Sequence, residues 1–251
     1  MTATTAGAVG ATRSRFYVWM AATFVLIAFG GFIPTYWAKL ASGTFGGHPI
    51  LHIHGMIFFT WTLFYFAQTS LVAAGRTPDH RAWGMAGISL ATAMGFTVVL
   101  AAINSIKVAE AMGLGDAARR FSVVSLTALV LFGVLFTLAI VNTRRPEVHK
   151  RLMILSMLPL MQAATARIFL TFFAPPGAVG PPPVFVAVPP GLLVCLLGVV
   201  AMVHDWRTQG KVHRVYLIGL PIVVAQILLS VPVGASAQWM AIARAVEGLA
   251  G

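Results

Sequence analysis

Residues 121–142 read FSVVSLTALVLFGVLFTLAIVN, 22 consecutive residues without a charged side chain. A helix needs roughly 20 mostly apolar residues to cross the hydrocarbon core of a bilayer, because each residue adds about 1.5 Å. The whole chain has the same character: hydrophobic residues make up 59% of the 251 positions and charged residues 9%, which is unusual for a soluble domain. The stretch predicts a transmembrane helix, and the composition predicts a lipid bilayer as the surroundings of the protein.

Six further apolar runs flank this stretch. Together they predict spanning helices at about residues 16–37, 50–74, 84–106, 121–142, 152–173, 184–203 and 214–235. The predicted fold class is therefore all-α, a polytopic transmembrane helical bundle of about seven helices. The run at 184–203 has five prolines around its start, so this helix either begins near Pro190 or is partly re-entrant.

The two ends of the chain differ in composition from the apolar runs between them. Residues 1–14, MTATTAGAVGATRS, are small and polar and predict a disordered N-terminal tail. The apolar run that follows lacks a convincing cleavage site, so we expect it to be a retained anchor. Residues 15–240 are predicted to form a single transmembrane domain, and residues 241–251 a short C-terminal tail.

The distribution of basic residues predicts the orientation. The chain has 17 Lys and Arg against 6 Asp and Glu, a formal net charge of +11. Eleven basic residues lie on the side of the N-terminus: Arg13, Arg15, Arg76, Arg81, Arg144, Arg145, Lys150, Arg151, Arg207, Lys211 and Arg214. The opposite side has only Lys39, Lys107, Arg119, Arg120 and Arg244. The positive-inside rule then predicts a cytoplasmic N-terminus and a C-terminus outside. Because the basic residues separate apolar runs, we expect anionic lipids as their partners and no nucleic acid.

A short internal repeat fits this topology. The segments GRTPDHRAWG (75–84), RRPEVHKRLM (144–153) and GKVHRVYLIG (210–219) each place a His before a basic residue at a predicted helix start. The bundle could therefore contain three repeated hairpins plus an N-terminal helix.

The segment GGHPILHIHGMIFFTW (46–61) has three histidines at the predicted start of a helix. His48 precedes Pro49, which favours the first helical position, so His48 is predicted to cap the helix. His52 and His54 point about 200° apart and cannot both face one ligand. Imidazole binds metals, haem iron and quinones, so His48, His52 and His54 are candidate metal ligands. The alternative is that water, headgroups or the backbone satisfy these rings.

A second candidate is Arg167, inside the predicted span 152–173. A guanidinium at this depth needs a partner or must reach the interface, and the predicted spans contain no Asp or Glu. We expect Arg167, Asn104 and His54 to lie at similar depths and to form an outward-facing ligand site. The other residues predicted to line it are Trp61, Tyr65, Met161 and Gln162, with Gln226 and Ser230 deeper. The alternative is that Arg167 reaches a lipid phosphate and the polar residues join helices.

A third group lies at the predicted cytoplasmic ends of the helices. Its members are His80, Arg81, His149, Lys150, Arg151, His213 and Arg214. We predict that they bind anionic lipid headgroups. If the repeats pack around a common centre, His80, His149 and His213 could instead converge on a metal.

Two local resemblances add to these predictions. HRAWG (80–84), HKRLM (149–153) and LHIHGMIFF (51–59) resemble motifs of uncharacterised bacterial inner-membrane proteins, a domain-of-unknown-function family with repeated His-Arg helix starts. This resemblance implies a bacterial inner-membrane location and no specific activity. HGMIFF (54–59) is also similar to the helix of haem–copper oxidase catalytic subunits that carries a haem-binding His, which corresponds to His54. The copper ligands and remaining haem ligands of that subunit have no counterparts in this chain.

The expected function is binding of a small or lipidic cofactor, a quinone or haem, at the outward-facing site. Two alternatives stay open at this stage. One is a non-catalytic accessory subunit or assembly factor of a larger membrane complex, and the other is a small transporter. No catalytic residue is predicted, and the sequence leaves open whether the protein is an enzyme.

Overall fold

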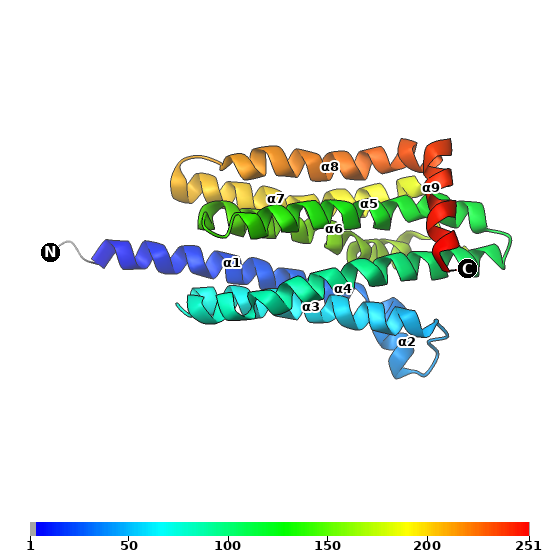
Figure 1. The fold of residues 1–251 in the computed structure, drawn as a ribbon, viewed down its shortest axis with the longest axis horizontal. Helices are drawn as coiled ribbons and strands as arrows, with labels where there is room; N and C mark the ends of the chain where they lie inside the picture. The colour runs from blue at the N-terminus through cyan, green and yellow to red at the C-terminus, as the bar shows by residue number, and fades with distance from the viewer. Residues whose placement is uncertain (1–3, 251) are drawn as a thin grey trace.

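The computed structural model describes the backbone of residues 4–250 and the side chains of residues 15–249, and this part of the chain is helical without strands (Figure 1). The helices are α1 (Thr4–Gly31), η1 (Ile33–Trp37), α2 (Ala38–Ala41), α3 (Pro49–Ala73), α4 (Thr77–Glu110), α5 (Gly115–Val141), α6 (Pro146–Phe173), η2 (Val184–Ala187), α7 (Val188–Gln209), α8 (Arg214–Ala235), α9 (Ala237–Glu247) and η3 (Gly248–Ala250).

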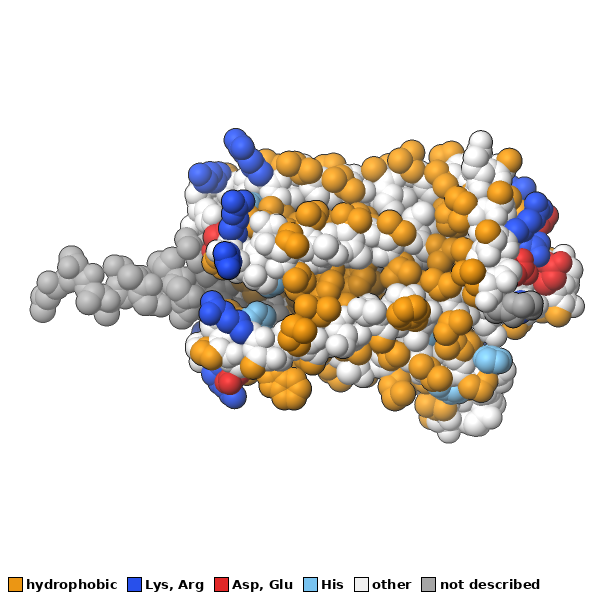
Figure 2. Space-filling view, in the orientation of Figure 1, with side chains coloured by type: hydrophobic (Ala, Val, Ile, Leu, Met, Phe, Trp, Pro, Cys, Tyr) orange, Lys and Arg blue, Asp and Glu red, His pale blue; other side chains and the backbone are white. Residues whose placement is uncertain are grey.

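Seven helical segments between residues 15 and 235 are long and apolar enough to cross a membrane. Hydrophobic side chains cover the sides of the bundle, whereas charged side chains gather at its two ends (Figure 2). The prediction of an all-α polytopic bundle with seven spanning helices is confirmed, and the chain is a multi-pass membrane protein. Figure 1 shows that α1 begins at one end of the bundle and α9 lies at the other. We call these the basic end and the distal end.

Four spanning helices, α4 to α7, extend beyond the predicted bounds, and α5 and α6 each begin six residues earlier than predicted. α4 starts at Thr77, with a proline in its first turn, and extends to Glu110. α7 continues to Gln209, where Gly210 in the left-handed conformation (φ 71°) terminates it. η2 and α7 together form a candidate span over Val184–Gln209, so the prolines around residue 184 do not interrupt it. Because α7 extends to Gln209, the acidic residue Asp205 belongs to a spanning helix.

The central element is α6, which packs against α1, α5, α7 and α8. An almost continuous run of its residues from Arg151 to Thr165 is buried. α1, α3, α4, α5 and α6 form a closed ring in which each helix packs on the next, while α7 and α8 cover the other side of α5 and α6. The α1–α6 contact is very close: a Cβ added to Gly31 would overlap the backbone of Ala164, so the contact requires a glycine.

Both ends of the chain differ from the predicted tails. Residues 241–247, predicted as part of a tail, belong to α9, which crosses the distal end of the bundle (Figure 1). The indole of Trp239 donates to the carbonyl of Arg119 (2.9 Å), and Arg119 pairs with Glu247 (2.9 Å). The predicted N-terminal tail consists of residues 1–14. Residues 1–3 lie outside the described part of the chain, and the backbone of residues 4–14 forms the start of α1.

Candidate functional site

The histidines of residues 48–54 have three different environments. His48 caps α3 as predicted, because its Nδ1 accepts a hydrogen bond from the backbone N–H of Ile50 (3.2 Å). His52 is hydrogen-bonded through Nδ1 to the hydroxyl of Tyr36 (2.9 Å) and packs on Phe45. These two side chains are therefore engaged separately, and no group of three or more His, Cys, Asp or Glu residues in the described part of the chain is arranged around a metal.

His54 is directed toward α4 and has one unfilled hydrogen-bonding position. Its ring packs on Phe58, with ring centroids 4.4 Å apart. Its Nδ1 is buried and has no hydrogen-bond partner among the described residues, an arrangement that proteins rarely leave unfilled.

Arg167 lies near His54, and its charge acts on the imidazole. The guanidinium lies over the ring of Phe32, 5.8 Å from the centroid, at the end of α1. Its side chain is exposed at the surface of the bundle, and no acidic side chain within residues 15–249 forms an ion pair with it. An exposed guanidinium on the side of a spanning helix faces either lipid headgroups or a bound ligand.

Two further residues are predicted for this site, and the structure corrects the prediction for one of them, Gln162. Asn104 is seven residues beyond Thr97, about 10 Å farther along α4 toward the distal end. Gln162 donates to the amide oxygen of Gln226 (3.0 Å), which in turn donates to Thr127 (2.9 Å). This amide chain joins α6, α8 and α5 in the interior of the bundle, so Gln162 is not a partner of Arg167.

The two aromatic residues predicted to line the site belong to the hydrophobic core. The indole of Trp61 donates to the sulfur of Met157 (3.3 Å), and the ring of Tyr65 packs edge-on against Phe24. Both side chains are buried between helices. Of the predicted site, the structure places Arg167 within electrostatic range of His54, and it adds the ring of Phe32 next to the guanidinium.

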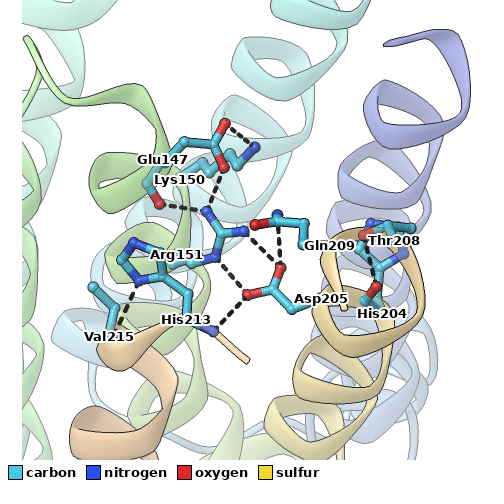
Figure 3. A network of polar contacts seen from close by, with 9 residues as sticks. All are labelled: Glu147, Lys150, Arg151, His204, Asp205, Thr208, Gln209, His213 and Val215. Carbon is cyan, nitrogen blue, oxygen red and sulfur yellow. Dashed lines mark hydrogen bonds and ion pairs between the residues drawn. The ribbon is translucent and has the colours of Figure 1, made fainter. Parts of the chain in front are cut away.

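At the basic end, Arg151 is fully buried in an ion-pair network (Figure 3). Its guanidinium makes a bidentate pair with Asp205 of α7 (2.7 and 2.6 Å), whose side chain is also fully buried. A third guanidinium donor contacts both the carboxylate (2.6 Å) and the carbonyl (2.7 Å) of Glu147. The prediction that Arg151 binds lipid headgroups is wrong, because its donors are already used inside the protein.

Asp205 is the residue that sequence reasoning missed. It lies two residues beyond the predicted span 184–203, and its partner Arg151 is 54 positions away in the sequence. Asp205 also accepts from the backbone N–H of His213 (3.2 Å), and the Nδ1 of His213 caps α8 by accepting from Val215 (3.2 Å). Burial is the main reason that the pKa of His213 lies below its ordinary value, and the nearby charge of Arg151 lowers it further. His213 is thus a helix cap rather than a headgroup ligand.

The remaining residues predicted to bind headgroups divide into two sets. Arg81 and Arg214 are exposed at the basic end, where they can reach lipid headgroups. Lys150 pairs with Glu147 (2.7 Å) and lies over the ring of Tyr17. His80 and His149 face one another, with ring centroids 6.2 Å apart, and His213 belongs to the separate Asp205 network. The predicted convergence of three histidines is therefore reduced to a pair.

Comparisons of the chain with protein-family models, with curated proteins and with solved structures give no match.

Proposed function

We propose that the protein binds a lipid-soluble quinone or quinol, and that Arg167 and His54 hold its head group. The observation that carries the proposal is that two polar groups without partners lie within electrostatic range of one another. Arg167 has N–H donors and no acidic partner in the described part of the chain, and the buried Nδ1 of His54 has no hydrogen-bond partner there. A quinol supplies hydroxyl donors, and both redox forms supply oxygen acceptors.

The surroundings of Arg167 favour a lipidic ligand over a water-soluble one. Arg167 is exposed on the outside of a bundle whose sides are apolar (Figure 2), so a ligand would reach it from the bilayer. The ring of Phe32 next to the guanidinium offers an aromatic surface for a flat head group. An isoprenoid tail would remain among the lipid chains and would need no cavity inside the protein.

The proposed location of this site is the outer leaflet of a bacterial inner membrane. Arg167 is six residues before the distal end of α6, and His54 is five residues after the start of α3 at the same end. The exposed basic side chains are concentrated at the opposite end, and by the positive-inside rule that end belongs in the cytoplasm. The quinone site would then face outward, as would α9 at the C-terminal end of the bundle.

A binding titration tests this function. The probe is decylubiquinone, added to the protein in detergent and followed by isothermal titration calorimetry. We expect saturable binding by the native chain and a Kd raised roughly 10- to 100-fold in Arg167→Gln, because charge-assisted hydrogen bonds contribute about 1.5–3 kcal/mol. His54→Phe keeps a ring of similar size and should also weaken binding, because it removes the ring nitrogen that lacks a partner.

The matched control is Arg120→Gln, which removes another exposed, unpaired arginine from a spanning helix near the distal end. This variant should bind the probe like the native chain. An equal Kd in the native chain and Arg167→Gln would refute the proposed site. A Soret absorption band in protein expressed with ample haem, lost in His54→Phe, would instead identify haem as the ligand.

A further inference from the structure

The second place where polar groups lack partners is at the basic end, far from Arg167. His80 lies in the first turn of α4 and His149 in the first turn of α6, and their ring centroids are 6.2 Å apart. In the five-helix ring α5 lies between α4 and α6, which make little direct contact with each other. The two imidazoles thus approach one another from helices that are not neighbours in the ring.

A backbone carbonyl fixes the tautomer of His149. Its Nδ1 lies 2.8 Å from the carbonyl oxygen of Ala139; since a carbonyl only accepts, Nδ1 carries the proton and Nε2 has a free lone pair. The Nδ1 of His80 is buried and has no hydrogen-bond partner among the described residues. Each ring therefore has one nitrogen that a ligand could engage.

The hydrogen bond of His149 to a backbone carbonyl is the arrangement found around metal-binding histidines. A ligating histidine usually donates its second ring N–H to a carbonyl or carboxylate, which orients the ring and leaves the other nitrogen for the metal. Metal–nitrogen bonds to imidazole are about 2.0–2.1 Å, so two rings on opposite sides of one ion have centroids roughly 6 Å apart. The observed separation of 6.2 Å fits this spacing.

We propose that His80 and His149 bind a single copper ion in its Cu(I) state, through Nδ1 of His80 and Nε2 of His149. Imidazole is a good ligand for copper, and Cu(I) accepts two-coordinate geometry. Zinc prefers four ligands, and the described residues contain no cluster of three or more His, Cys, Asp or Glu side chains to supply them. The ion would tie α4 to α6 at the basic end, and it does not depend on the quinone site at the distal end.

The test measures Cu(I) binding to metal-free protein in detergent, under anaerobic reducing conditions and in competition with bicinchoninate. A Cys195→Ala background removes the sole thiol of the chain as a competing ligand. We expect one Cu(I) per chain, and an affinity at least tenfold lower in both His80→Gln and His149→Gln. The double variant should bind Cu(I) no more weakly than the single variants, because each single substitution already destroys a two-ligand site.

The matched control is His213→Asn at the same end, which keeps a residue suited to capping α8 and should bind copper like its parent. A measurement on the native sequence avoids any effect of substitution on folding: Cu(I) should protect His80 and His149, but not exposed His48, from diethylpyrocarbonate. Absence of stoichiometric Cu(I) binding, unchanged affinity in both single variants, or a preference for zinc would overturn the proposal.

Discussion

Arg151 is the largest fully buried side chain of the described residues, and it keeps its charge through its contacts with Asp205 and Glu147. Removing one partner from a buried ion pair leaves an uncompensated charge, at a cost of about 3–5 kcal/mol, whereas replacing both partners with apolar groups is often neutral. The pair also joins α6 to α7 and, through the N–H of His213, to the start of α8. This network therefore fixes three helix ends at once.

The first prediction concerns this pair. Asp205→Asn should lower the thermal midpoint of unfolding strongly, and Arg151→Met combined with Asp205→Leu should recover most of the loss. Unfolding is measured in detergent with a thiol-reactive fluorophore, because buried Cys195 is the sole cysteine of the chain. Asp79→Asn serves as the control, because its pair with Arg76 is exposed and such pairs contribute about 0–1 kcal/mol. Equal midpoints for the two single variants would contradict the stabilising role of the buried pair.

At the same scale, the sequence predicts some residue roles and not others. The cap formed by His48 follows from its position before Pro49, and the unusual character of Arg167 follows from its place in an apolar run. The positions of Gln162, Asn104 and Arg151 depend on helix rotation and length, which hydropathy does not determine. Seven extra residues at the start of α4 and six at the end of α7 are enough to change which side chains meet.

At the scale of elements, α6 organises the bundle because it contacts four other long helices and its basic half is buried on every side. The buried half of α6 has no face toward the lipid. The hydropathy of its sequence, however, does not distinguish α6 from the helices at the periphery of the bundle. The seven spans are predictable from run length alone. The central position of α6 is not, because it follows from close contacts such as that of Gly31 with Ala164.

The second prediction tests that contact. Gly31→Ala should destabilise the protein by roughly 1–3 kcal/mol, the usual cost of overpacking, because the added methyl group would overlap the backbone of α6. The neighbouring Gly30→Ala is the control: nothing lies within 4 Å of its added Cβ, and alanine favours a helix by about 1 kcal/mol over glycine. The same thiol assay should show opposite shifts of the midpoint, and two similar decreases would argue against a close α1–α6 crossing.

At the scale of the whole molecule, the ends of the bundle have different roles. The basic end contains the histidine pair, the buried ion-pair network (Figure 3) and most of the exposed basic residues (Figure 2). The distal end is closed in part by α9, which is anchored by Trp239 and by the ion pairs of Arg119. Arg167 and His54 lie near the distal end, so the two proposed ligands would bind at opposite sides of the membrane.

The third prediction concerns this orientation. In a Cys195→Ala background, a cysteine in place of exposed Ser42 should react with a membrane-impermeant maleimide in intact spheroplasts. A cysteine in place of exposed Arg145 should react only after the membrane is opened or inverted. The reverse pattern would place the basic end outside and would contradict the orientation proposed from the positive charges.

The central claim is that a quinone head group lies against Arg167, and photo-crosslinking tests it most directly. Membranes containing the native protein are illuminated with an azido-quinone, and the labelled peptides are identified by mass spectrometry. Labels should map to the segments around Phe32, His54 and Arg167, and they should disappear in Arg167→Gln but persist in Arg120→Gln. Labelling confined to other helices, or equal labelling of all three proteins, would show that Arg167 does not hold such a ligand.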